Sequence, residues 1–337
     1  MATKRDQKSI VCIGGGTGTF VVLRGLKNHP YNLSAIVTMS DSGGSNRRIR
    51  DEFGLLPTSD IRQCLVALSD ENGGVGLLRK LFMYRFEKGR GIAGMTFGNL
   101  FMAALTDIVG SQEEAIRMTG KVLRIRGSVI PVTLTSTDLY ATYADGHTEK
   151  EEHLIDEPEH DGTLPIVNTY LKPAAKPNPK AIDAIRKADL VVIGPGDLYT
   201  SIIPNLLVEG ISEAIKTSHA PVVYVMNLMT KYGQTYNFRA SDHIRILEQY
   251  LGTSIDHILV NTAPLSPKAL AIYAKSHEIP VVNDLDPHAY YHITKAALVS
   301  KTLYNKSSSD SLIRSLIRHD SELLAQVLVS LLERNNT

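Results

Sequence analysis

Ser9-Ile-Val-Cys-Ile-Gly-Gly-Gly-Thr-Gly18 begins with an uninterrupted apolar run and ends in a turn with four glycines. A continuously apolar run rich in β-branched residues is typical of a strand that a parallel sheet buries on both faces. Apolar side chains then recur at helical spacing from Thr19 to Lys27, and a second strand is expected from Leu33 to Met39. The chain is therefore predicted to open with a β-α-β unit.

The same alternation returns in the second half. Strands are expected at 190–193, 222–226, 257–261 and 280–282, and helices at 204–216, 242–251 (capped by Ser241), 267–277 and 320–333 (capped by Asp320). Four further helices are expected at 60–69, 77–86, 98–108 and 112–123. Alternation on this scale predicts an α/β fold in one domain over 1–337: a doubly wound, mostly parallel sheet with helices on both faces.

From about 129 to 179 the alternation of strands and helices gives way to short alternating runs of apolar and polar residues separated by turn signals. Alternating runs flank Asp145-Gly146, which is a strong hairpin signal. The segment closes on Lys172-Pro-Ala-Ala-Lys-Pro-Asn-Pro179, which is too rich in proline for a helix or a strand and is expected to be a linker. We therefore predict a small antiparallel insertion.

The composition excludes several classes of function. The 337 residues carry a formal net charge of +1 and no tryptophan, which disfavours nucleic-acid partners. Cys12 and Cys64 lack C-x-x-C spacing and are expected to be reduced core thiols. No apolar run approaches the roughly 18 residues of a membrane span, and a signal-peptide pattern is lacking at the N-terminus. We expect a cytoplasmic protein without membrane insertion.

The first glycine-rich turn is a candidate phosphate site. Glycines between a strand and a helix let the backbone approach a ligand, and the helix N-terminus then favours an anion. The alternative is a tight turn that needs glycine only for its geometry. The dinucleotide fingerprint is not met because Thr19 takes the place of its third glycine, and no Walker lysine follows. The candidates are Gly14, Gly15, Gly16, Thr17 and Gly18.

A second such turn follows the strand at 190–193. It also follows a parallel strand, so it is expected at the edge of the sheet where open α/β folds bind ligands. Gly15 and Gly196 should therefore flank one crevice. The candidates here are Gly194, Pro195, Gly196, Asp197, Tyr199, Thr200 and Ser201, together with Asn227 at the end of the next strand.

Other candidates lie between the two turns. Asp41-Ser-Gly-Gly-Ser45 follows the second strand and is a third candidate anion-binding turn, through Asp41, Gly43, Gly44 and Ser45. Arg48 and Arg50 would either clamp phosphate or lie on a solvated face. Asp60 and Arg62 open a helix, where Asp60 would bind a ligand or cap the helix. Asn99 would contact a base or sugar, or only end a turn.

Histidines and acids in the predicted insertion could mimic a metal-binding cluster. Their irregular spacing in a polar loop predicts a solvated surface rather than a metal site; they are His153, Asp156, Glu157, Glu159 and His160. No cysteine or serine nucleophile with a nearby base is evident.

Taken together, the motifs resemble those of the CofD-like proteins, and within them the YvcK branch of gluconeogenesis factors. The matching segments run in family order across most of the chain: Ile13-Gly-Gly-Gly-Thr-Gly18, Val37-Thr-Met-Ser-Asp-Ser-Gly-Gly-Ser45, Ser59-Asp-Ile-Arg62, Gly98-Asn-Leu100, Gly194-Pro-Gly-Asp-Leu-Tyr-Thr-Ser-Ile202 and Ala240-Ser-Asp-His243. The resemblance implies a Rossmann-like three-layer fold with a crevice for a nucleotide diphosphate.

The resemblance also implies two functions. CofD proteins transfer a phospholactyl group from a guanosine diphosphate donor to a deazaflavin with Mg²⁺, whereas the YvcK branch is associated with UDP-sugars, cell shape and wall synthesis. This chain departs from the family pattern at Ser42, where a second acid is usual, and at Arg47 and Ser59, where glycine is usual. Since hard cations prefer carboxylates, Ser42 removes an expected Mg²⁺ ligand beside Asp41.

The resulting hypothesis is a regulatory protein that binds a nucleotide sugar of the UDP-N-acetylglucosamine type, as a homodimer with a protein partner in wall synthesis. The rival hypothesis is a Mg²⁺-dependent phosphoryl-type transferase in which Asp41 and Asp60 hold the metal. An NAD(P)-dependent oxidoreductase is a third option, disfavoured by the incomplete fingerprint. Mg²⁺ is the one cofactor that these hypotheses imply.

Overall fold

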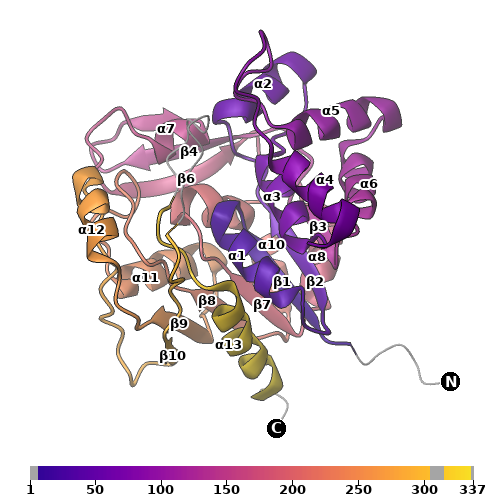
Figure 1. The fold of residues 1–337 in the computed structure, drawn as a ribbon. Helices are drawn as coiled ribbons and strands as arrows, with labels where there is room; N and C mark the ends of the chain where they lie inside the picture. Colours follow the sequence, from indigo (N-terminus) through magenta and orange to yellow (C-terminus); the bar gives the residue numbers. More distant parts are fainter. Residues whose placement is uncertain (1–6, 304–314, 335–337) are drawn as a thin grey trace, which may run out of the picture.

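The computed structural model describes residues 7–303 and 315–334 and is built on a seven-stranded parallel sheet (Figure 1). The order across the sheet is β10-β9-β8-β7-β1-β2-β3. Every neighbouring pair in it is parallel. This confirms the predicted fold class. The strands are β1 (Ser9–Gly14), β2 (Asn32–Val37), β3 (Ser128–Pro131), β7 (Leu190–Ile193), β8 (Val222–Val225), β9 (His257–Asn261) and β10 (His292–Ala296).

The strand order places a switch point beside β1. The chain first winds from β1 through β2 to β3, and later winds the opposite way from β7 to β10. β1 and β7 are hydrogen-bonded neighbours, with Ile13 paired to Ile193, so the two glycine-rich turns leave the sheet side by side. Connections that diverge in this way open a crevice at the carboxyl ends of the strands.

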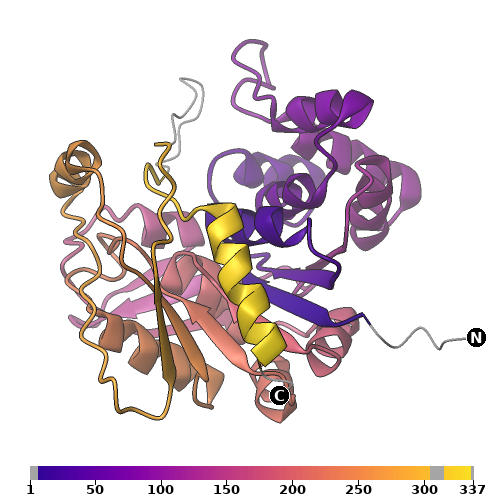
Figure 2. The same cartoon turned by 60° about the horizontal axis from the view of Figure 1, so that its bottom comes forward.

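Helices cover both faces of the sheet because its strands present apolar side chains to each. Ile10 and Cys12 of β1 face one side, and Val11 and Ile13 face the other. The first layer contains α1 (Gly16–Leu26), α3 (Ser59–Leu68), α5 (Phe97–Val109), α6 (Gln112–Val122) and α13 (Ser321–Arg334). The second contains α8 (Pro179–Arg186), α9 (Ile203–Leu206), α10 (Ile211–Thr217) and α11 (Ala240–Leu251). Figure 2 shows α13 lying along α1, which it contacts.

A three-stranded antiparallel sheet, ordered β5-β4-β6, forms the insertion. The strands of this sheet are β4 (Asp138–Tyr143), β5 (Thr148–Lys150) and β6 (Ile166–Lys172). The insertion also contains the short helix α7 (Glu152–Asp156), between β5 and β6 in the chain. The predicted start near residue 129 was too early, because β3 pairs with β2 in the main sheet. The predicted hairpin at Asp145-Gly146 is confirmed as the β4–β5 turn.

Several elements differ from prediction because their sequence patterns are weak. The helix α2 (Gly44–Phe53) was not predicted, since it is polar apart from Ile49 and Phe53. The helix expected over 204–216 is divided into α9 and α10, and a π-helical turn that was not predicted, η1 (Leu198–Ile202), precedes them. β10 was missed because it is largely half-exposed. The expected strand at 280–282 forms only isolated bridges. The remaining helices are α4 (Gly73–Met83) and α12 (Pro267–Tyr273).

The two predicted helix caps have different outcomes. Asp320 caps α13, since its carboxylate accepts hydrogen bonds from the Glu322 and Leu323 amides. Ser241 does not cap α11, because the helix begins at Ala240, two residues earlier than predicted, with Arg239 at its N-cap position. The Ser241 hydroxyl donates instead to Asp284. Among the helices of the described ranges, none combines the length and the apolar composition that a bilayer crossing requires.

Candidate functional site

Both glycine-rich turns line one crevice at the carboxyl ends of β1 and β7. Gly15 and Gly196 are both in its wall, which confirms that the turns share a site. Gly18 packs so closely on the other turn that a Cβ there would collide with the Pro195 carbonyl oxygen. Gly16 has φ +61°, and the one nearby atom that a Cβ there would meet is the Ser201 hydroxyl oxygen at 3.9 Å, so it keeps the backbone accessible to a ligand. α1 begins at this point without a side-chain cap, so its N-terminal amides face the crevice.

Most of the other predicted residues of the two turns also line the crevice. Thr17, Pro195, Asp197, Thr200, Ser201 and Asn227 are in its wall. The Asn227 amide donates to the Gly196 carbonyl at 2.8 Å, which ties the end of β8 to the second turn. Gly14, Gly194 and Tyr199 lie outside the wall. Tyr199 is 1% exposed and packs in the apolar core beneath the turn.

Asp41, Gly43 and Asp60 form the side of the crevice nearest β2. The Asp41 carboxylate accepts a hydrogen bond from the Gly43 amide at 2.9 Å. Asp60 lies against Gly15, where its carboxylate would collide with any added Cβ. The helix α3 has Thr58 at its N-cap position, so Asp60 is not the cap and is positioned to face the site.

Four further predicted site residues lie behind the crevice wall. The Asn99 amide donates to the Ser45 and Ser59 hydroxyls at 3.0 and 3.2 Å, and it accepts from Arg62 Nε at 3.0 Å. Asn99, Ser45 and Arg62 are all buried, and Gly44 begins α2 beside them. A buried polar network of this kind holds the loops in place. A ligand contact for these four residues stays a prediction.

The arginines of α2 hold the helix against neighbouring segments. Arg47 pairs with Glu151 at 2.9 Å, and Arg50 pairs with Asp138 at 2.9 Å. Arg48 donates to the Ala93 carbonyl at 2.9 Å. Neither proposed role, as a phosphate clamp or as a solvated face, describes Arg50, because it is half-buried and paired to the insertion.

The insertion supplies site residues that the sequence did not reveal. Glu152, His153 and Asp156 of α7 line the crevice, so the prediction of a solvated surface was wrong for His153 and Asp156. The Ser42 amide donates to Glu152 at 3.4 Å, and the Ser42 hydroxyl accepts from the His153 amide at 3.1 Å. A carboxylate from α7 therefore lies beside Asp41 even though the second acid of the loop is absent. The one sequence signal for this contribution is the four-residue spacing of Glu152 and Asp156, which places both carboxylates on one face of a short helix.

Lys231 and Glu278 complete the polar lining from loops after β8 and α12. Lys231 Nζ lies 3.4 Å from Asp156 Oδ2, and both side chains are mostly buried. The segment just before α13 closes the crevice with Ser315, Ile317, Arg318 and His319. These residues come from irregular segments whose sequence carries no periodic pattern.

The crevice is electrostatically strained by its carboxylates. Burial raises the pKa of Glu152 well above its ordinary value, and Asp41, Asp156 and Asp60 raise it further. Burial and Asp156 raise the pKa of Asp197 to about 6, and burial raises that of Glu278 to about 7. Burial alone would lower the pKa of Lys231, but Asp156, Asp197 and Glu278 together raise it. A bound cation would relieve this repulsion.

The donor set suits a hard divalent cation. Mg²⁺ in proteins is held by one or two carboxylates and completes its shell with water and ligand phosphates. Asp41 and Asp60 face the crevice beside the first glycine turn, with Glu152 near Asp41. The residues present therefore fit Mg²⁺ held between the protein and a phosphorylated ligand.

Comparison with known proteins agrees with this geometry. The family described as 2-phospho-L-lactate transferase CofD matches residues 10–302. The chain belongs to the CofD family. It is 39% identical over 333 residues to the gluconeogenesis factor of Bacillus subtilis strain 168, covering 97% of this chain and 99% of that one. It is 38% identical to the gluconeogenesis factor of Listeria monocytogenes, covering 98% and 97%.

A solved structure is also similar to this CofD-family chain. A crystal structure of a Bacillus halodurans protein, described as a member of the upf0052 family, superposes with a TM-score of 0.86 at 38% identity. The match covers 96% of this chain and 99% of that one. Family, fold and relatives therefore agree over nearly the whole length.

Proposed function

We propose that this protein binds a nucleotide sugar of the UDP-N-acetylglucosamine type and acts as a regulator of cell shape and wall synthesis during gluconeogenic growth. The observation that carries the proposal is the meeting of the two glycine turns at the switch point, beside the uncapped N-terminus of α1. Backbone amides at such a position bind phosphate oxygens. The gluconeogenic part of the proposal is supported by relatives of this chain that are named gluconeogenesis factors.

The acidic lining bears on how a diphosphate would bind. Asp41, Asp60 and Glu152 would repel an anionic ligand unless a cation lies between them. We infer that the ligand binds together with Mg²⁺, held by Asp41 and Asp60. Binding would place a sugar beyond the diphosphate, towards Lys231 and the segment before α13. Occupancy could then be sensed by a protein partner, or across a homodimer, at this face.

Binding is tested by calorimetric titration of UDP-N-acetylglucosamine with and without Mg²⁺, with GDP in a parallel arm. Gly16→Val should abolish measurable binding, because its side chain enters the crevice and the residue strains the turn at φ +61°. Gly252→Val is the matched control: it has φ +66°, nothing lies within 4 Å of a Cβ there, and it ends α11. Both variants should lose about 1–2 kcal/mol of stability. Equal affinity in Gly16→Val and Gly252→Val would reject the phosphate role.

A Mg²⁺-dependent phosphoryl-type transferase is the second candidate, and one observation favours it. Glu152 supplies a carboxylate beside Asp41, so the argument that Ser42 deprives the site of an acid no longer holds. Phosphorus NMR of the protein with UDP-N-acetylglucosamine and Mg²⁺, with sugar alcohols and phospholactate as acceptors, separates the two functions. We expect an unchanged spectrum; enzyme-dependent UMP together with a new phosphodiester of the acceptor would overturn the regulatory function and establish the transferase.

A further inference from the structure

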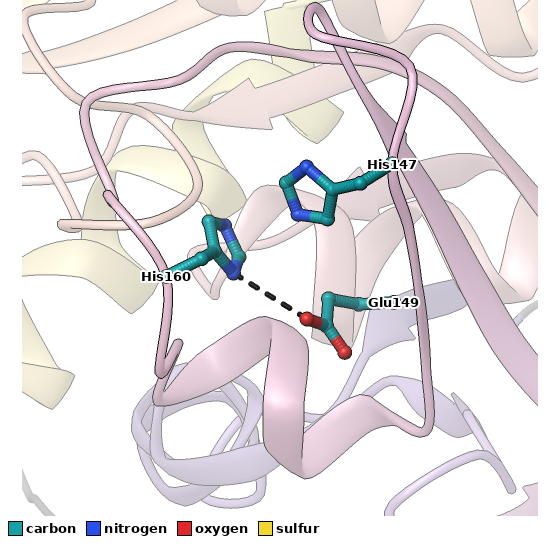
Figure 3. Close-up of side chains that lie close together, drawn as sticks. All are labelled: His147, Glu149 and His160. Atoms are coloured by element: carbon teal, nitrogen blue, oxygen red, sulfur yellow. Dashed lines mark ion pairs between the residues drawn. The ribbon is translucent and has the colours of Figure 1, made fainter.

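A second cluster of ligand-type side chains lies on the small antiparallel sheet. His147 follows the β4–β5 turn, Glu149 lies in β5, and His160 lies between α7 and β6. One ligand atom of each lies within 4.8 Å of the other two, and in the described residues this is the one such group of three. Figure 3 shows the three side chains close together, with the ion pair between His160 Nδ1 and Glu149 Oε1 at 3.6 Å.

Three of the four ring nitrogens in this cluster lack the hydrogen-bond partners that buried imidazoles usually have. Within the described residues, His147 Nε2 and both ring nitrogens of His160 are buried and make no hydrogen bond. Buried polar atoms are almost always satisfied, so such a concentration in one place calls for a ligand. The ion pair with Glu149 accounts for only one of the three nitrogens.

The Asp145 carboxylate holds the His147 ring in the orientation that metal binding requires. His147 Nδ1 lies 2.5 Å from the Asp145 carboxylate, which leaves Nε2 as the coordinating atom. A carboxylate on the far nitrogen is the usual support for a metal-bound histidine. The Tyr143 ring stacks on His147 at 4.5 Å between centroids and meets His160 edge-on at 4.2 Å. Both imidazoles are therefore oriented by packing.

We propose that His147, Glu149 and His160 form a binding site for a zinc-class divalent metal, separate from the nucleotide crevice. Two imidazoles and one carboxylate suit Zn²⁺, whereas Mg²⁺ and Ca²⁺ prefer oxygen ligands. Tetrahedral Zn²⁺ with bonds of about 2.0–2.1 Å separates its ligand atoms by roughly 3.3 Å. Small side-chain rotations would bring the cluster to that spacing, and water would complete the shell.

This metal would also connect to the crevice through α7. Glu149 precedes Glu152 by three residues, and His160 follows Asp156 by four. The metal ligands therefore bracket the helix that delivers two carboxylates and His153 to the crevice. A metal joining both ends of this segment would restrict α7 and so stabilise the crevice wall.

The test uses the full chain, freed of metal with a chelator and titrated with Co²⁺ and then Zn²⁺. We expect visible absorption typical of nitrogen-ligated, four-coordinate Co²⁺ at one equivalent, displaced by Zn²⁺. His160→Ala and His147→Ala should lose the absorption, and Asp145→Asn should weaken affinity about 10–100-fold. His219→Ala removes an exposed histidine outside the cluster and should bind as the unchanged protein does.

Further arms exclude the alternatives. Asp41→Asn should keep the Co²⁺ absorption, since the carboxylates of the crevice belong to another site. If the alanine variants fail to fold by circular dichroism, X-ray absorption of the unchanged Zn²⁺-loaded protein decides, and it should show two imidazoles. Metal binding that survives His160→Ala, a shell with oxygen ligands only, or no stoichiometric binding would each overturn the proposal.

Discussion

Asp197 is the N-cap residue of the π-helical turn after β7, where burial and Asp156 raise its pKa to about 6. In an unfolded chain its pKa would be near 3.8. The folded state therefore holds a proton more tightly than the unfolded state. The stability this contributes is complete below about pH 4 and is lost as the pH rises through 6.

Asp197→Asn should consequently raise the thermal midpoint at pH 8 and leave it unchanged at pH 4. The gain is at most about 3 kcal/mol, since one pKa unit is worth about 1.4 kcal/mol. The measurement is thermal unfolding of the metal-free protein at both pH values. Asp107→Asn replaces an exposed carboxylate on α5 and should change stability by less than about 0.5 kcal/mol at either pH. A destabilised Asp197→Asn at pH 8 would show that the carboxylate is stabilised by Lys231 rather than strained.

Single site residues could be predicted from the sequence where a residue type serves one structural purpose, as glycine does in a tight turn. Gly15, Gly16, Gly18 and Gly196 line the crevice as predicted, because few other residues allow a backbone to approach a ligand so closely. The sequence did not reveal that Asn99 and Arg62 belong to a buried hydrogen-bond network, and a ligand contact for them stays a prediction. A polar residue next to a motif can satisfy either the fold or a ligand, and sequence alone does not distinguish the two.

At the scale of elements, α7 is the unexpected contributor to the site. Glu152→Gln should weaken Mg²⁺-dependent nucleotide binding about 10-fold or more, because it removes a negative charge beside Asp41. Calorimetric titration in the presence and absence of Mg²⁺ measures the change. Glu159→Gln replaces an exposed carboxylate a few residues away and should bind normally. Equal Mg²⁺ dependence in the two variants would remove Glu152 from the cation site.

Elements with strong periodicity were predicted well, and those without it were not. β1, β7 and β9 are buried on both faces, and their apolar runs stand out. The edge strand β10 has a mixed, half-exposed sequence that resembles loop or helix. The polar helix α2 is held by ion pairs with the insertion, which connect residues 104 and 88 positions apart. Such long-range pairings leave no local signal.

At the scale of the whole molecule, strand order turns separate motifs into one site. Three segments of the first 60 residues, four segments of the second half and the insertion meet around the crevice. The alternation of strands and helices predicted the parallel sheet, and the sheet rule predicted that Gly15 and Gly196 meet. Which loops close the site could not be predicted, because that depends on how the insertion and the segment before α13 pack.

A crystal structure of the protein soaked with UDP-N-acetylglucosamine and Mg²⁺ tests the central claim most directly. We expect the diphosphate between the Gly15–Gly18 turn and the Pro195–Gly196 turn, at the N-terminus of α1, with the cation against Asp41 and Asp60. A guanine nucleotide soaked in parallel reports on the choice of base. A nucleotide bound elsewhere on the molecule, with both turns empty at saturating ligand, would contradict the account.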